Sequence, residues 1–399
     1  MLDFYDFVIF AVFALDIGQS FFPNDNPLFE IMAAFSAFAV GYLARPLGGI
    51  LFSHFGDKYG RKKSFIFSII IMGWTTLCMG LLPSYHDYGL SMPLIFLSLR
   101  VIQGIAIGGE IPGAITYVTE HVKRKPGLAC GIIFSFLNLG IIIAHLFDAS
   151  ISLLIPHLPF YVPAWRIAFI IGGLLAIISY FLRTSLEESP EYLSFQHKVH
   201  NIPLIDLFKQ HREALIVATL IVAIQATLIS IIYLYSTSFM QLTKLYSEKE
   251  ITNINLIGLS LFCLTNILWG MLADYYGHKT ILIIGALFLI PGSFFFYQGL
   301  LNHNNVILLS LIMAIISGMT TGSFAAVVAK MFPTPVRYSG IGVSYNLAFA
   351  IFAGLSPLLT TSLIEKTHNM MVPAYLMMAI AFIGFLTSLF STTLKEYMK

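Results

Sequence analysis

Long apolar runs, separated by short stretches that hold glycine, proline or charge, make up almost the whole chain. A helix needs about 20 apolar residues to cross the hydrocarbon core of a bilayer. The strands of an outer-membrane barrel would need alternating segments of about 10 residues, and these runs are too long and continuous for that. We therefore predict twelve membrane-spanning helices, with the approximate bounds 1–22, 28–54, 64–83, 93–119, 127–155, 160–184, 213–240, 250–274, 279–300, 305–331, 338–364 and 372–393.

The composition also indicates a membrane protein. Of the 399 residues, 57% are hydrophobic and 11% are charged, and the mean hydropathy is +0.83. A soluble domain of this length could not cover that much apolar surface. The first run has no basic segment before it and ends without a small-residue cleavage site, so we expect it to be the first span and not a signal peptide.

Lysine and arginine are distributed unevenly between the two sides. Sixteen lie in the tail and the loops of one side, and three lie in the loops of the other. Because cytoplasmic loops carry the excess of these residues, both termini are predicted to be cytoplasmic. The basic excess is therefore a topology signal, and we expect a lipid bilayer around a monomeric chain and no nucleic-acid partner. The three cysteines lie in apolar runs without metal-like spacing, so neither a metal site nor a cofactor is predicted.

Residues 48–63 form a polar turn between the second and third spans. Its glycines, Gly49 and Gly60 among them, would let two helix ends approach closely. Asp57 could accept hydrogen bonds from a helix N-terminus or pair with Arg61. The turn is therefore predicted to lie at the cytoplasmic face of the membrane, where the basic residues that follow Gly60 would hold it.

A weaker copy of this turn recurs in the second half of the chain. It covers residues 269–279, and its acid, Asp274, follows Asp57 by 217 residues. The longest polar stretch, residues 185–212, lies between the two copies and is too short for an enzyme domain. The repeat indicates a duplicated membrane transporter, with halves at 1–184 and 213–399.

Ionisable residues lie within the spans of the first half. Asp3 and Asp6 share a face of the first helix. Arg100 and Glu110 lie in the fourth span, and Glu110 is about 15 Å above Glu120, near the bilayer midplane. Such groups are unfavourable in a bilayer unless they face a cavity or a partner, so they indicate a functional centre. The alternative for Asp3 and Asp6 is simple hydration at the cytoplasmic end of their helix.

The second half offers neutral polar side chains in place of charges. If a substrate lies between the halves, the first half would supply charge and proton coupling, and the second would supply hydrogen bonds and aromatic faces. The alternative for each neutral residue is ordinary hydrogen bonding between helices. The predicted substrate-binding residues of both halves are Tyr5, Arg45, Gln103, Asn138, Gln225, Tyr233, Tyr235, Tyr345 and Asn346.

Several stretches together resemble the major facilitator superfamily, and within it the metabolite:proton symporters, which carry proline and betaine, 2-oxoglutarate, citrate or shikimate. The resemblance implies an all-α integral membrane protein with twelve transmembrane helices in two pseudo-symmetric six-helix bundles, joined by a linker at 185–212. It also implies a midplane site and alternating access by rocking of the bundles. The matching stretches are residues 4–7, 45–49, 56–62, 100–110, 165–166, 186–190, 332–340 and 345–346.

The resemblance assigns roles to the two turns as a gate. His278 stands where the family has an arginine, which predicts a weaker gate in the second half. The family also implies a bacterial inner membrane. The gating residues that it implies are Gly49, Asp57, Gly60, Arg61, Glu120, Asp274 and Arg337.

Proton coupling is assigned by the resemblance to Asp6 with Arg100, because related sugar:proton symporters pair an acid and an arginine at these places. Separation of the pair during rocking would let Asp6 take up a proton. Counting helix rise along straight helices leaves the two residues at different heights. Glu110 is therefore the alternative acid, and Asp3 lies beside Asp6 on the same helix.

The substrate remains open between two chemical classes. A mono- or dicarboxylate needs cationic donors, which Arg45 and Arg100 could supply. A zwitterion of the proline or betaine type needs aromatic faces or an acid for its cation, and aromatic residues are plentiful. We favour the zwitterion. A drug exporter of the same fold is a further alternative, whereas an enzyme is not expected, since no nucleophile, metal cluster or phosphate loop is found at either face.

Overall fold

The computed structural model describes residues 5, 9–10, 13–24, 27–154, 163–195 and 203–391. These residues form helices and no strand. The helices of the first half are α2 (Ala14–Phe21), α3 (Pro27–Tyr59), α4 (Arg61–Leu81), α5 (Tyr85–Tyr88), α6 (Ser91–His121), α7 (Pro126–Leu154) and α8 (Ala164–Thr184). Two short helices, α9 (Pro190–Phe195) and α10 (Pro203–Gln210), follow.

The second half contains longer elements that are interrupted by other helix types. Its α-helices are α11 (Arg212–Thr227), α12 (Ser236–Thr243), α13 (Glu248–Tyr276), α14 (His278–Leu301), α15 (Val306–Lys330), α16 (Arg337–Ala348), α17 (Ser356–Thr367) and α18 (Val372–Phe390). Two π-helical segments, η3 (Leu228–Tyr235) and η5 (Phe349–Ala353), and a 3-10 turn, η4 (Thr334–Val336), complete it.

Ten helical stretches of the described residues are long and apolar enough to cross a membrane. They coincide with the third to twelfth predicted spans within a few residues at each end, except that the fifth, 126–144, ends eleven residues before the predicted end, although α7 itself continues to Leu154. The second predicted span corresponds to α3, whose 33 residues give a length of about 50 Å. This helix runs past the predicted end at residue 54, so the polar turn is shorter than expected.

Gly60 alone separates α3 from α4. Its φ of +114° lies in the region that glycine adopts without strain. Asp57, which we expected in a loop, is therefore in the last turn of α3, where the helix fixes the direction of its side chain.

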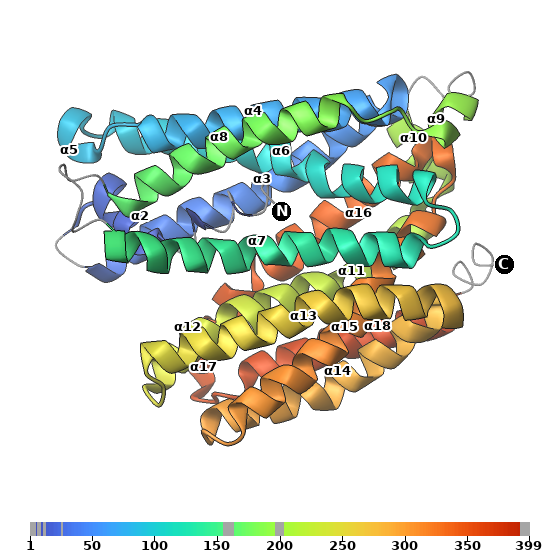
Figure 1. The fold of residues 1–399 in the computed structure, drawn as a ribbon. Coiled ribbons are helices and arrows are strands. Elements are labelled where there is room, and N and C mark those ends of the chain that lie inside the picture. Colours follow the sequence, from blue (N-terminus) through green and yellow to red (C-terminus); the bar gives the residue numbers. More distant parts are fainter. Residues whose placement is uncertain are drawn as a thin grey trace.

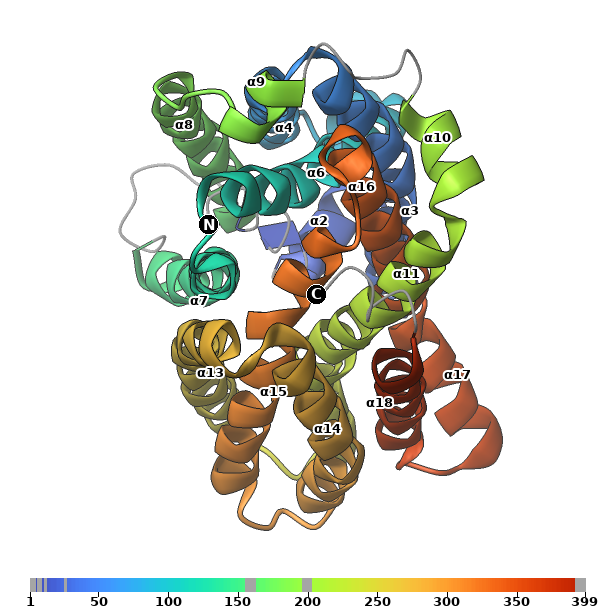
Figure 2. The ribbon, with the colours of Figure 1, turned by 90° about the vertical axis from the view of Figure 1, so that its right-hand side faces the viewer.

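The long helices form two groups that lie side by side (Figure 2). One group contains α2 to α8, and the other contains α11, α13 to α15, α17 and α18. The groups meet along two seams: α7 packs against α13, and α16 packs against α3 and α6. The short helices α9 and α10 lie at one end of the bundles, and α5 lies at the opposite end (Figure 1). We call these ends the α9 face and the α5 face.

The two π-helical segments were not predicted. They interrupt the seventh and eleventh predicted spans and contact each other, and Ser230 donates a hydrogen bond of 2.8 Å to the carbonyl of Ala353. Such segments are found mostly at functional positions of helices. Hydropathy could not indicate them, because the residues involved are as apolar as their neighbours.

Candidate functional site

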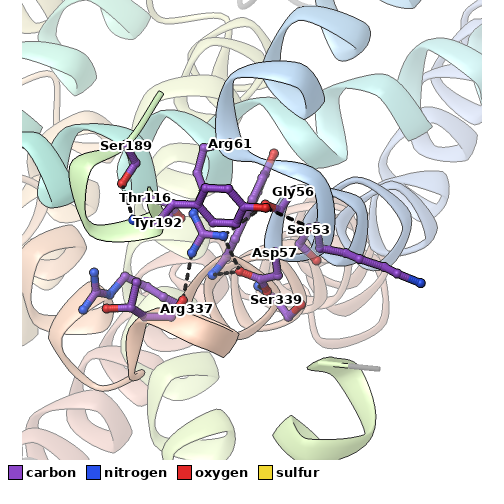
Figure 3. A network of polar contacts seen from close by, with 12 residues as sticks. Ser53, Gly56, Asp57, Arg61, Thr116, Ser189, Tyr192, Arg337 and Ser339 are labelled. Carbon is purple, nitrogen blue, oxygen red and sulfur yellow. Dashed lines mark hydrogen bonds and ion pairs between the residues drawn. The ribbon is translucent and has the colours of Figure 1, made fainter. Parts of the chain in front are cut away.

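Asp57 joins the two bundles at the α9 face. Its carboxylate accepts hydrogen bonds from the backbone amides of Tyr338 (3.3 Å) and Ser339 (2.8 Å), in the first turn of α16. The amides at a helix N-terminus carry partial positive charge and have no acceptor within the helix, so a carboxylate there is favourable. Asp57 is fully buried and also pairs with Arg61 at 3.1 Å (Figure 3).

Arg61 extends this contact into a network of charges. It pairs with Glu120 of α6 at 3.2 Å and donates to the carbonyl of Thr334 at 2.8 Å. Glu120 also binds Arg337 of α16 at 3.3 Å. The structure thus brings together four of the predicted gating residues, and we call this set, Asp57, Arg61, Glu120 and Arg337, the Asp57 clasp.

The short helix α9 and the two residues before it reinforce the Asp57 clasp. Glu188 accepts the amide hydrogen of Arg61 at 2.9 Å, and the hydroxyl of Ser189 donates to Glu120. Glu191 pairs with Arg337 at 2.5 Å and with Lys123 at 3.3 Å. We did not assign these residues to the gate, although Glu188 and Ser189 lie in a stretch that resembled the family.

The environment of Glu191 favours its charged form. Burial alone would raise the pKa of this carboxyl, but hydrogen bonds from Arg337, Lys123 and Thr334 lower the pKa below its ordinary value. Glu191 therefore remains a carboxylate at neutral pH and supplies Arg337 with a lasting anionic partner.

Asp274 makes a second contact of the same kind at the other seam. Its two carboxylate oxygens accept the amides of Gly127 and Leu128, both at 2.8 Å, in the first turn of α7. The imidazole of His278 lies 2.9 Å from the same carboxylate. We call Asp274 and His278 the Asp274 clasp.

Arg100 lies deep in the first bundle and is fully buried. Its guanidinium group lies over the ring of Phe10 at 4.3 Å and near that of Phe38 at 5.4 Å, and it donates to the side-chain oxygen of Gln103. Gln103 in turn donates to Thr76 at 2.8 Å. Asp3 and Asp6 lie outside the described residues, so their predicted contact with Arg100 stays a prediction.

Arg45 lies at the seam between α3 and α16. It is fully buried, its Nε donates to the side-chain oxygen of Asn346 at 3.3 Å, and rings of Tyr345 and Phe349 lie over its guanidinium group at 5.7 and 4.9 Å. Tyr42 is a third ring at 5.3 Å. Gly49 also lies at this seam, beside Asn346. The structure therefore places three predicted residues around one another and adds Tyr42 and Phe349, which we had not singled out.

Glu110 has a partner that we did not foresee. We counted Arg183 among the loop cations, but it lies in the last turn of α8 and is buried, and its guanidinium group forms an ion pair with Glu110. Ser68 of α4 donates to the same carboxylate at 2.8 Å. Glu110 is thus bound between helices of one bundle, where the arginine neutralises its charge.

The other predicted substrate residues have local partners. Gln225 accepts a hydrogen bond from Thr321 at 2.8 Å, and Tyr235 accepts one from Thr361 at 3.3 Å. In addition, Tyr233 stacks on Phe262 at 4.5 Å, Tyr5 meets Phe147 edge to face at 6.1 Å, and Asn138 is buried on α7.

Asn266 of α13 is one of the neutral polar residues of the second half, but we did not include it among the predicted substrate-binding residues. It is fully buried, and neither atom of its side-chain amide has a hydrogen-bond partner within the described residues. The sequence shows it only as one polar residue in an apolar run.

Two family models match the chain. That of the Major Facilitator Superfamily matches residues 2–260, and that of the Sugar (and other) transporter family matches residues 195–398. The glycine betaine/proline/ectoine/pipecolic acid transporter OusA of Dickeya dadantii is 33% identical over 411 residues, which cover 98% of this chain and 80% of the relative. The proline/betaine transporter of Escherichia coli K12 is 32% identical over 419 residues, which cover 99% of this chain and 81% of the relative.

Solved structures show the same fold. The proton:xylose symporter XylE bound to 6-bromo-6-deoxy-D-glucose superimposes with a TM-score of 0.76 at 17% identity, covering 98% of this chain and 92% of its own. The human organic anion transporter MFSD10 superimposes with a TM-score of 0.74 at 13% identity, and the match covers 97% of this chain and 96% of MFSD10. The chain therefore belongs to the major facilitator superfamily: it is a multi-pass membrane transporter, not an enzyme, with twelve helices in two six-helix bundles.

Proposed function

We propose that this protein is a proton-coupled importer of a small zwitterion of the proline and betaine type. One structural observation carries the proposal. Two buried arginines, Arg45 and Arg100, lie along one aromatic wall of α3, since Tyr42 contacts Arg45 at 5.3 Å, Phe38 contacts Arg100 at 5.4 Å, and the two rings meet at 5.1 Å. Cationic donors suit a carboxylate, and aromatic faces suit a quaternary or secondary ammonium group.

The relatives support this choice of substrate. Those reported above carry proline and betaine by name, at 32–33% identity over nearly the whole chain. The second half also places neutral groups in its spans, with Gln225, Asn266 and Thr321 all buried. Neutral hydrogen-bonding groups on one side and cations on the other fit a cargo that is itself neutral overall.

Proton coupling is proposed for Asp6 with Arg100. Asp6 and Phe10 are four residues apart and would share one face of a helix. Phe10 contacts the guanidinium group of Arg100 at 4.3 Å, so the first helix lies against Arg100 at this residue. Glu110 is the weaker candidate, because its ion pair with Arg183 would have to break before a proton could bind.

Gating is proposed for the two clasps. Both hold the bundles together at the α9 face, and their opening would expose the buried centre to that side. We propose that the α9 face is cytoplasmic, that both termini lie there, and that the protein acts as a monomer with halves at 1–184 and 213–399 in a bacterial inner membrane. The excess of lysine and arginine on this side supports the orientation.

A mono- or dicarboxylate is the second candidate substrate. The observation that favours it is the pair of buried arginines, since two cations could bind two carboxylates. The neutral polar side chains of the second half favour a zwitterion over this candidate.

Uptake by proteoliposomes tests the proposal. Purified protein would be given labelled proline, glycine betaine or 2-oxoglutarate, with and without an acidic exterior. We expect proline or betaine to accumulate when the exterior is acidic, and a protonophore to abolish the accumulation. The Asp6→Asn variant should lose accumulation but keep exchange of internal for external substrate. Accumulation that needs no proton gradient, or full accumulation by Asp6→Asn, would contradict the mechanism.

A further inference from the structure

Arg45 is held in place from three helices. Its Nε donates to the side-chain oxygen of Asn346 on α16 at 3.3 Å. The amide nitrogen of Asn346 donates to the carbonyl of Gly108 on α6 at 2.7 Å and to that of Gly342 at 2.8 Å. Asn346 therefore has no freedom to turn, and the plane of the guanidinium group is fixed by the seam between the bundles.

The other end of the guanidinium group lacks acceptors. Neither Nη1 nor Nη2 of Arg45 has a hydrogen-bond partner in the part of the chain that the structure describes, although the side chain is fully buried. Two other buried arginines, Arg61 and Arg183, each meet a carboxylate. Arg45 thus differs from them in having a charge and two donor groups without an anion.

Aromatic rings surround Arg45 but cannot replace that anion. Tyr42, Tyr345 and Phe349 lie 4.9 to 5.7 Å from the guanidinium carbon, and Tyr345 and Phe349 stack on each other at 4.4 Å. Ring faces attract a cation and make its burial tolerable between transport cycles. The hydroxyl of Tyr345 also interacts with the guanidinium group, but it is neutral, and a buried cation without an anion is unfavourable.

The position of Arg45 suits a transported ligand. Along α3 it lies twelve residues before Asp57, or about 18 Å above the Asp57 clasp, near the middle of a bilayer core of about 30 Å. The surrounding seam is the place where the bundles part when a clasp opens. A ligand could therefore reach Arg45 during the transport cycle. A permanent anionic partner of Arg45 would prevent that ligand from binding.

We infer that Arg45 is the anchor for the carboxylate of the cargo, bound in a fork by Nη1 and Nη2, while Asn346 and the three rings fix the guanidinium plane. The inference rests on the proposed function and names the group that the cargo must carry. Small molecules with a carboxylate would bind, and choline, which shares the cation of glycine betaine but has no carboxylate, would not. Lysine could not replace Arg45 fully, because an ammonium group lacks the planar fork.

Equilibrium binding to the purified protein in nanodiscs tests the anchor apart from transport. Labelled glycine betaine and proline would be measured against wild type, Arg45→Gln and Arg45→Lys. We expect Arg45→Gln to lower the affinity for both compounds about 100-fold, the effect of losing a charge-assisted pair of hydrogen bonds, and Arg45→Lys to lower it about 10-fold. Choline should compete poorly with labelled glycine betaine and proline for binding to all three proteins.

Arg166→Gln is the matched control. Arg166 also lies over an aromatic ring, that of Trp165 at 4.7 Å, but it lies near the α5 face and donates to the carbonyl of Leu82. Its replacement should leave the affinity unchanged. If Arg45→Gln does not fold, Phe349→Leu, which only loosens the ring around the guanidinium group, should still weaken binding several-fold.

The outcomes separate this inference from the proposed function. Wild-type affinity of Arg45→Gln for betaine would overturn the anchor while the zwitterion function stands. Binding of 2-oxoglutarate but not of betaine or proline, lost in Arg45→Gln, would overturn the zwitterion and support the anchor. Tight binding of choline by wild type would overturn the requirement for a carboxylate.

Discussion

The two clasps use the same anchor in different surroundings. In each, a buried or nearly buried aspartate from one bundle accepts two amides at the start of a helix of the other: Asp57 binds α16, and Asp274 binds α7. The partial charge at the helix N-terminus strengthens both contacts. The repeat in the sequence therefore became a repeat in the structure, with one clasp at each seam.

The surroundings of the two aspartates differ in charge. Asp57 lies beside Arg61, which continues to Glu120, Arg337 and Glu191. Asp274 is paired, among the described residues, with the imidazole of His278 alone. An arginine is charged at every physiological pH, whereas an imidazole gains or loses its charge near neutrality. The comparison teaches that closure of the α9 face is uneven: one seam is held by a network of several ion pairs and the other by a single contact between a carboxylate and an imidazole.

Replacing the aspartate of each clasp should have the largest effect on amide exchange, and the two replacements should differ most in their effects. Asp57→Ala leaves Arg61 buried without this partner, and breaking a buried ion pair costs about 3–5 kcal/mol. Exchange of the amide hydrogens of Tyr338 and Ser339 should accelerate about 100-fold or more, because these amides lose their acceptor. Asp274→Ala should accelerate exchange at Gly127 and Leu128 by only about 10-fold, since fewer charges depend on it.

Hydrogen-exchange mass spectrometry on the first turns of α16 and α7 measures both effects in one experiment. The exposed Glu187 provides a control, and Glu187→Gln should change neither turn. Equal acceleration by the two alanine variants would contradict the difference between the clasps.

Protonation of His278 should change the Asp274 clasp by a smaller amount. Burial of the imidazole and the cation of Lys330 oppose its charged form, and the carboxylate of Asp274 favours it. When the pH falls from 7 to 5, protonation converts the hydrogen bond into an ion pair, and exchange at Gly127 and Leu128, corrected for its intrinsic pH dependence, should slow a few-fold. Exchange at these two amides should be slow at both pH values in His278→Arg and fast at both in His278→Gln.

The His278→Gln variant serves as the reference for that measurement, because the first turn of α16 is bound by Asp57, and burial raises the pKa of this carboxyl to about 6. A pH response of His278→Gln equal to that of wild type would assign the effect to another group. His278 stands where related proteins are expected to have arginine. Transport by His278→Arg would therefore show whether a permanent cation in the Asp274 clasp slows transport.

Glu191→Gln should give the smallest effect. The pKa of Glu191 is lowered in the closed structure, so its contribution is present at all pH values above its ordinary range and is lost only when the pH falls through that lowered value. Arg337 keeps Glu120 as a second partner. Exchange at Ser339 should therefore accelerate only about two- to three-fold, equally at pH 7 and pH 6. A larger loss at pH 6 would show that Glu191 titrates in this range.

The positions of the helices could be predicted from the sequence because they depend on local properties. A run of about 20 apolar residues has one stable state in a bilayer, and the loops between such runs carry the charge that orients them. For the same reason the family could be recognised from short motifs, and Asp57, Arg61 and Asp274 could be singled out before their contacts were known.

The partners of each charge were decided by the tertiary structure. Arg183 was counted as a loop cation and binds Glu110 inside a bundle, and Glu191 was part of the predicted linker and completes the Asp57 clasp. Tyr42 and Phe349, which were not singled out from the sequence, lie against Arg45. Hydropathy specifies that a segment is a membrane helix but not its rotation or its height relative to its neighbours. Those two quantities are set by packing between helices, and they determine which buried cations meet an anion and which, like Arg45, lie among aromatic rings.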